Sequence, residues 1–451
     1  MLAGCATSAS IDPARLPTTP AAYKESTVAV GTAERADARV PPLQASWWTV
    51  FADPVLDQLV EQAGRNNNSL QVAAGRLAQA RAIARTTDAD RLPQIELGAG
   101  AARQKNSGTG NQSQTEVSVG ANLAYEVDLI GKLSLNSNAA SLDATSSEAL
   151  LRSTRLLVQA NVTQTYLNLR ALDTERTLVR DTLQAYRNTL RLTEVRFKEG
   201  DVAELDVARV RAEVAATESE ALALDRRRAE LEHALAVLMG EVASNFSVSP
   251  ADWATALPVI PAGVPSTLLA RRPDVSAAQS TMQAAQARVG VAKAAWFPSF
   301  SLTATGGYAA PEISDLFKLA TRAWGVGALL SLPIYDGGRR QAGVQSANAE
   351  MDIALANYRE QVLVTFQDVE DQLSALRLLA AQSEAQSRSV ASATRATVLS
   401  DARYRNGFVS QLELLDAQRS ELRNRRQALQ VKTAQYLVTV GLIRALGGGW
   451  A

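Results

Sequence analysis

The sequence predicts a protein of mixed α and β class, mainly α, in which one structural unit occurs twice. The segment Arg196-Phe-Lys-Glu-Gly200 matches Arg403-Tyr-Arg-Asn-Gly407 at an offset of 207 residues, and Gly131 matches Gly338 at the same offset. Each half also carries two segments of alternating apolar and polar residues, followed by a long stretch without proline. Repeats are sought first because missing one misassigns the whole fold. We therefore expect an internal twofold repeat of helix, paired strands and a long helical hairpin.

The composition favours an elongated helical protein and argues against partners that bind by charge. The 451 residues include 46 Lys and Arg balanced by 46 Asp and Glu, so no net field would recruit nucleic acid. Aromatic residues make up only 5% of the chain, which is typical of long helices and coiled coils rather than compact cores. No apolar run of about 18 residues occurs, so we expect no membrane-spanning helix.

Residues 1–45 are predicted to form a lipid-anchored, extended segment. Cys5 is the only cysteine and ends Leu2-Ala-Gly-Cys5, which resembles the bacterial lipobox, in which the cysteine is acylated. An accidental thiol near the chain end is the alternative. The proline-rich residues that follow predict an extended segment. The resemblance implies a covalent lipid (palmitate) on Cys5 and anchoring in the outer membrane, although acyl chains by themselves form no channel.

The two copies of the repeat occupy residues 46–248 and 274–451. A linker at 249–273 joins them, and its prolines prevent it from being helical throughout. The first copy opens with Trp47-Trp48 and two helices separated by the polar segment Asn66–Ser69. The second copy opens with a helix.

Four segments alternate between apolar and polar residues and are expected to be strands. They lie at about 94–104, 116–129, 299–308 and 323–334. Alternation over about ten residues is typical of a strand in a membrane barrel, with a soluble sheet wet on one face as the alternative. Aromatic residues gather near the strand ends, as an interfacial girdle requires: Tyr125, Trp296, Phe297, Tyr308, Trp324 and Tyr335.

Four strands per chain cannot close on themselves. An open sheet in lipid would leave the backbone N–H and C=O groups of its edges unpaired, at a cost of several kcal/mol each. Closure must therefore come from other copies of the chain. Three copies give about twelve strands, within the range of bacterial barrels. We therefore expect a homotrimer with a twelve-stranded transmembrane β-barrel.

The long hairpins are expected at about 134–240 and 338–446. Each rising helix lies between two glycines that are separated by 68 residues without proline, and a helix of that length spans roughly 100 Å. Helices this long predict a coiled-coil barrel rather than a globular core. The charged run Asp225–Arg228 on the first returning helix is expected to be a solvated face.

If the hairpins form a tube, the Gly200 and Gly407 turns lie at its far end, where the conduit must close at rest. Glycine permits the sharp turn there. Leu412 and Asp416 are four residues apart and share one face of the returning helix. In a trimer they would form a ring of leucines beside a ring of carboxylates, as in other channel constrictions.

No catalytic or metal-binding constellation is recognisable. His233, the only histidine, lies within Leu231-Glu-His-Ala-Leu235 and is expected on a helix surface, because a lone histidine has no zinc partners. No Ser or Cys nucleophile has an available base, and no glycine-rich phosphate loop follows a strand. We therefore expect no enzyme activity and no cofactor apart from the lipid on Cys5.

Several sequence blocks in order resemble the TolC-like outer membrane factor family, in particular its lipoprotein (NodT-type) branch that serves resistance-nodulation-division efflux pumps. The blocks are Trp47-Trp48, Leu269-Ala-Arg-Arg-Pro-Asp-Val275, Phe297-Pro298, Pro333-Ile-Tyr-Asp-Gly-Gly338, Leu414-Leu-Asp-Ala-Gln-Arg419 and Ala445-Leu-Gly-Gly-Gly-Trp450. The resemblance implies a homotrimeric twelve-stranded barrel continued by a helical barrel in the periplasm. It also implies that Leu412, Asp416 and Arg419 narrow the periplasmic aperture. Tyr404, Glu413 and Asp206 match positions in a polar network between neighbouring hairpins.

The predicted function is a passive outer membrane exit duct of a tripartite efflux system for drugs or small molecules. Its partners would be a periplasmic adaptor that docks on the Gly200 and Gly407 turns, an inner membrane resistance-nodulation-division transporter, and outer membrane lipid. The same duct in a type I protein secretion system is one alternative. A periplasmic coiled-coil scaffold lipoprotein without a pore is another.

Overall fold

The computed structural model describes residues 15–25, 46–105, 113–253, 255, 257–260 and 265–448. The predicted lipid site at Cys5 lies outside these residues. The chain divides into two compact units, which we describe separately. The first contains Ala74–Leu150 and Asp274–Val362, and the second contains Thr18–Ala73, Leu151–Pro273 and Leu363–Ala451. Helices predominate, so the mainly helical class is confirmed.

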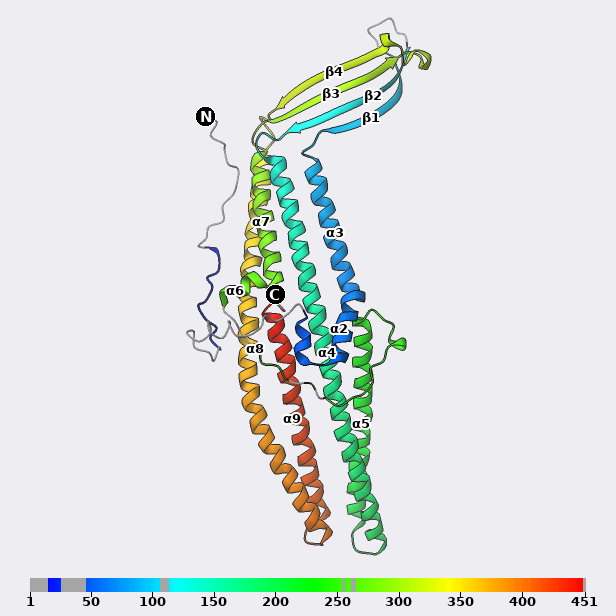
Figure 1. The fold of residues 1–451 in the computed structure, drawn as a ribbon, viewed down its shortest axis with the longest axis vertical. Helices are drawn as coiled ribbons and strands as arrows, with labels where there is room; N and C mark the ends of the chain where they lie inside the picture. Colours follow the sequence, from blue (N-terminus) through cyan, green and yellow to red (C-terminus); the bar gives the residue numbers. More distant parts are fainter. Residues whose placement is uncertain are drawn as a thin grey trace. The chain divides into compact units, whose positions relative to one another are not determined.

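The first unit contains one antiparallel sheet whose strands follow the order β1-β2-β3-β4, so β1 and β4 are its edges (Figure 1). Its strands are β1 (Gln94–Lys105), β2 (Ser113–Val127), β3 (Ser299–Ala310) and β4 (Arg322–Ser331). The register places apolar residues beside one another, for example Ile95 beside Leu123 and Ala304 beside Val326. In the single chain this apolar face is open, with Leu97 86% exposed and Val326 77% exposed.

Two strands end earlier than the alternation predicts, each for a local reason. β2 ends at Val127 rather than near 129, because Asp128 turns to accept hydrogen bonds from the backbone N–H groups of Leu133 (3.1 Å) and Ser134 (2.8 Å). These bonds satisfy free donors at the start of the following helix. β4 ends at Ser331 rather than near 334, because Pro333 has no N–H to donate to a ladder.

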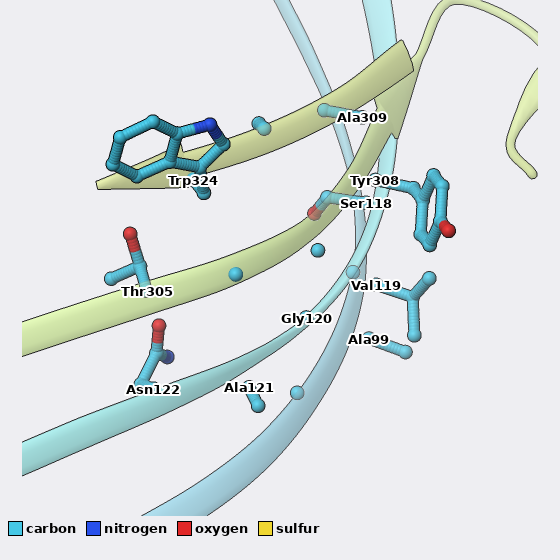
Figure 2. A pocket seen from close by; sticks show the side chains of 15 residues that line it. Ala99, Ser118, Val119, Gly120, Ala121, Asn122, Thr305, Tyr308, Ala309 and Trp324 are labelled. Atoms are coloured by element: carbon cyan, nitrogen blue, oxygen red, sulfur yellow. The ribbon is translucent and has the colours of Figure 1, made fainter. Parts of the chain in front are cut away.

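A row of glycines crosses the sheet where β2 and β3 approach closely. Gly98 pairs with Gly120, which pairs with Gly307. A Cβ atom on Gly307 would lie 2.2 Å from the carbonyl oxygen of Val119 and 2.5 Å from Cα of Gly120. Figure 2 shows the strands curving through this point. Glycine is therefore required at 307 for the backbones to meet.

The helices include two very long ones, each followed by a shorter returning helix. α4 (Lys132–Lys198) and α8 (Arg339–Arg405) have 67 residues each, and α5 (Glu204–Leu238) and α9 (Gln411–Ala445) have 35 each. The other helices in the described residues are α2 (Pro54–Asn66), α3 (Asn68–Ala89), α6 (Pro265–Arg271), α7 (Pro273–Ala294) and the 3-10 helices η2 (Trp47–Phe51), η3 (Ala243–Asn245), η4 (Ile313–Asp315) and η5 (Leu319–Thr321).

The core of the second unit forms where helices from the two halves of the chain meet. Trp47 and Phe51 of η2, Tyr166 of α4, Leu235 of α5 and Tyr436 of α9 belong to one buried cluster. The Phe51 and Tyr436 rings stack with centroids 6.4 Å apart. The Trp indoles and Tyr rings supply large apolar areas that stabilise this junction.

The expectation that Asp225–Arg228 forms a solvated face is wrong for Arg228, which is only 8% exposed. Its guanidinium contacts Asp173 of α4 at 2.8 Å and Glu232 at 3.1 Å, and it donates to the carbonyl of Val248. Asp173 also accepts from Arg170. The carboxylates compensate the buried charge, and the chain after η3 packs against this cluster. Arg226 and Arg227, in contrast, are exposed.

Candidate functional site

The two hairpin turns lie in the second unit and use the same local geometry. Gly200 has φ +84° and Gly407 has φ +75°. At the first turn, Gly200 N–H donates to Phe197 and Asp201 N–H to Arg196; at the second, Gly407 N–H donates to Tyr404 and Phe408 N–H to Arg403. This is the Schellman arrangement, which ends a helix with a left-handed residue. A Cβ atom at either glycine would meet no atom within 4 Å, so the backbone dihedral alone requires glycine.

The start of α9 presents two of the predicted gate residues to solvent. The hydroxyl of Ser410 accepts from the backbone N–H of Glu413 (3.4 Å) and caps the helix. Leu412 is 42% exposed, and the Asp416 side chain is 63% exposed and 3.5 Å from Arg419. An exposed leucine and carboxylate one helical turn apart are thus available to face other chains.

Gln411 ties the two hairpins together at this end. Its buried carboxamide oxygen accepts from the hydroxyl of Tyr404 on α8 (2.8 Å) and from the hydroxyl of Thr193 on α4 (2.7 Å). The guanidinium of Arg196 lies 4.9 Å from the centre of the Tyr404 ring. Tyr404 is 4% exposed, so these polar groups interact away from water, where hydrogen bonds are strongest.

Arg419 forms a second contact between the two hairpins. Its Nε donates to Glu213 of α5 at 2.9 Å. That hydrogen bond, which outweighs the opposing effect of burial, raises the pKa of the Arg419 guanidinium. Farther along α9, Arg426 contacts Glu175 of α4 at 2.7 Å and also pairs with Glu220 of α5.

These ion pairs border a groove of about 360 Å³ between α4, α5 and α9. Tyr186 lies at its base and is fully buried. Burial, followed by the charge of Glu213, raises the pKa of its hydroxyl to about 12. The Tyr186 hydroxyl is therefore neutral at physiological pH. The helices that border the groove are held together by the arginine–carboxylate pairs around it.

The predicted site residues thus divide into three groups. Tyr404 and Arg419 join the two hairpins, while Leu412 and Asp416 are exposed. Glu413 pairs with Arg403 at 3.8 Å and Asp206 with Arg209 at 3.8 Å, each within its own hairpin. Sequence reasoning missed Gln411, Thr193 and Glu213. Only the position of Gln411 next to Leu412 could have indicated one of them, because the contacts of a glutamine, threonine or glutamate depend on the helix opposite.

Nothing in the described part of the chain suggests a catalytic centre. No group of three or more His, Cys, Asp or Glu residues there could hold a metal ion. His233 is exposed on α5. Among the described helices, none is long and apolar enough to cross a membrane.

Comparison with known proteins gives a consistent match over most of the chain. The family model described as "Outer membrane efflux protein" matches residues 59–241 and 264–448. The chain is 31% identical to the cation efflux system protein CusC of Escherichia coli O6:H1, covering 90% of this chain and 88% of that protein. It is 34% identical to the pyoverdine export outer membrane protein OpmQ of Pseudomonas putida, with 90% and 88% covered. The solved structure of the outer-membrane channel OprN superposes with a TM-score of 0.87 at 31% identity, covering 96% of this chain and 98% of that chain.

Proposed function

The chain belongs to the outer membrane efflux protein family, and from this membership we propose that three copies form a passive exit duct of a tripartite pump. It is an outer membrane component of an efflux system. The observation that carries the proposal is the open four-stranded sheet. One of its faces is apolar and exposed, and its edges β1 and β4 have no further strand partner among the residues that the structure describes. Unpaired edges in lipid cost several kcal/mol per group, so the sheet must be closed by other chains.

Three sheets joined edge to edge give a barrel of about twelve strands. The face that carries Asn122 and Thr305 would then line the lumen, and the face that carries Leu97 and Val326 would contact lipid. The two hairpins of each chain, which have equal lengths, would act as repeats in a helical barrel in the periplasm. Residues 46–248 and 274–451 would be the repeated halves on either side of the 249–273 linker.

The periplasmic end would be closed by Leu412 and Asp416, which a trimer presents three times around one axis. Arg419 would hold α9 against α5 through Glu213. Tyr404 would add a contact between the two hairpins of one chain through Arg196. Glu413 and Asp206, which pair within their own hairpins in the single chain, would add polar contacts to the hairpins of neighbouring chains. Rings of apolar and charged side chains close other channels by dewetting and by charge.

The gate assignment predicts that Leu412→Ala with Asp416→Ala raises single-channel conductance in planar bilayers by about twofold or more, because the constriction becomes wider and less charged. Leu378→Ala with Asp371→Ala, an exposed pair of the same residue types on α8, is the control and should leave conductance unchanged. Equal conductance of the gate variant and the unmodified protein would remove these residues from the gate.

The energy for export would come from a resistance-nodulation-division transporter in the inner membrane, reached through a periplasmic adaptor at the Gly200 and Gly407 turns. The two relatives named above export a cation and pyoverdine, so the fold by itself sets no substrate. We propose small molecules as the cargo, a covalent lipid on Cys5 as the anchor, and no resident cofactor or catalytic activity. Copurification of the adaptor and transporter with the membrane-embedded protein tests the partners; an inner membrane ATPase of a protein exporter in their place would contradict them.

A further inference from the structure

We propose that the outward face of the sheet binds phosphate groups of outer-leaflet lipid through Arg103 and Arg322, one from each edge strand. The proposal rests on the barrel of the proposed function, because only closure brings the two edges together. It adds a specific contact with phosphorylated lipid at each seam between chains.

The two faces of the sheet differ in their charged residues. Successive side chains of a strand point to opposite faces, and the register extends each face across all four strands. Glu96, Glu116 and Glu126 lie on the face of Asn122 and Thr305. Among the paired positions with described side chains, the apolar face carries only two charged residues, Arg103 on β1 and Arg322 on β4.

Arg103 and Arg322 lie at the same end of the sheet. The β1–β2 and β3–β4 connections lie at one end of the sheet, and the strands join the helices at the other end. Arg103 lies two residues before the end of β1, and Arg322 is the first residue of β4, so both lie at the connection end. With the helices in the periplasm, that end faces the outer leaflet.

The guanidinium groups of both arginines are available to bind an anion. Arg103 and Arg322 are exposed, and neither forms an ion pair with any residue that the structure describes. The nearby acid Asp315 pairs with Lys318, and Glu312 accepts from Ser314 at 3.5 Å. An unpaired arginine on an otherwise apolar face needs an anion or water for its five donors.

Aromatic side chains mark the level of the membrane interface beside Arg322. Its partner across β3 is Tyr308, whose ring meets that of Phe317 edge-on at 5.6 Å. Trp324 lies two residues along β4 on the same face and is 73% exposed. Figure 2 shows Tyr308 and Val119 on the side of the sheet opposite Asn122 and Thr305. Aromatic rings of this kind lie at lipid headgroups, where phosphates are located.

Closure joins β4 of one chain to β1 of the next, so each seam has an Arg322 and an Arg103 on its outward side. A guanidinium binds phosphate with two parallel hydrogen bonds, and two of them at one seam suit a lipid that carries more than one phosphate. The occupant is therefore an outer-leaflet lipid that carries more than one phosphate. Three seams give about three such sites in a trimer.

The test titrates the purified full-length protein in detergent with diphosphorylated lipid A and counts bound lipids by native mass spectrometry. We expect Arg103→Gln with Arg322→Gln to weaken binding about tenfold or more, because it removes the charge-assisted hydrogen bonds. Arg85→Gln, which removes the same charge from an exposed position on α3, should bind as the unmodified protein does. Dephosphorylated lipid A should bind weakly to all variants.

Equal lipid A affinity of the double variant and the unmodified protein would overturn the proposal. So would displacement of the lipid by millimolar inorganic phosphate, which would indicate a site for a free anion. If the double variant does not assemble, Arg322→Lys decides: it keeps the charge but loses the paired hydrogen bonds, and it should bind measurably more weakly. Conductance of the unmodified protein in the same preparation tests the duct separately, so a failed lipid site and a failed duct give different results.

Discussion

Gly307 on β3 lies against the backbone of β2, whereas its neighbour Gly306 has open space around its Cβ direction. The two glycines are adjacent on one strand, and Gly307 pairs with Gly120, which is labelled in the bend shown in Figure 2. They differ in which face they occupy and in how closely the next strand approaches. Glycine is therefore required at 307, where a side chain would meet the β2 backbone, and it is not required at 306.

Gly307→Ala should destabilise the sheet by about 1–3 kcal/mol, because a backbone must shift to accept the new methyl group. Gly306→Ala should change stability by less than about 0.5 kcal/mol. The measurement is the temperature at which the assembled protein dissociates in detergent. Equal dissociation temperatures for the two variants would show that the close approach at Gly307 has no energetic weight.

Arg228 and Arg226 provide a second comparison within one helix. Arg228 is buried among Asp173, Glu232 and the Val248 carbonyl, and Arg226 forms an exposed pair with Glu230. Arg228→Ala removes one cationic partner from the buried carboxylates of Asp173 and Glu232, although Asp173 keeps Arg170, and should lower the free energy of unfolding by about 3 kcal/mol. Arg226→Ala should cost less than about 1 kcal/mol. Thermal unfolding of the two variants measures the difference; similar midpoints would contradict the buried network.

At the scale of elements, periodicity was sufficient to predict which segments are strands and which are helices. Alternation of period two marks β1–β4, and the absence of proline over 68 residues marks α4 and α8. The strand ends were harder to predict, because Asp128 leaves its strand to cap a helix and Pro333 interrupts the ladder. The alternating pattern does not predict where such local interactions end a strand.

The contacts between elements could not be predicted in the same way. The turns at Gly200 and Gly407 follow from residue type, since few other residues adopt positive φ. Arg228 and Gln411 are ordinary polar residues in helices, and only the packing of a second helix makes them buried. Leu412 and Asp416 are exposed in the single chain, so their predicted gating role depends on sister chains.

Gln411 should be the most sensitive contact between the two hairpins. Gln411→Ala removes the acceptor of the buried Tyr404 hydroxyl and one of the two acceptors of Thr193, whose hydroxyl keeps the carbonyl of Thr189 at 2.9 Å. The loss should cost about 1–3 kcal/mol. Looser hairpins should also raise single-channel conductance. Gln382→Ala on the exposed surface of α8 is the control and should alter neither the unfolding temperature nor the conductance. If both variants have the unfolding temperature and conductance of the unmodified protein, the hydrogen bonds of Gln411 do not stabilise the contact between the hairpins.

At the scale of the whole molecule, one requirement connects the sheet, the hairpins and the lipid contacts. Within the residues that the structure describes, the sheet has two unpaired edges and an exposed apolar face, and the predicted gate residues Leu412 and Asp416 are exposed. Each feature is unfavourable or without function in a single chain in a membrane. All are satisfied together when chains surround a common axis, and family membership makes that axis an efflux path.

Native mass spectrometry of the assembly released from detergent measures how many chains close the barrel. We expect a species with the mass of three chains plus bound lipid, because three sheets close a barrel of about twelve strands. A protein that is released only as single chains, under conditions in which its helices remain folded, would contradict it.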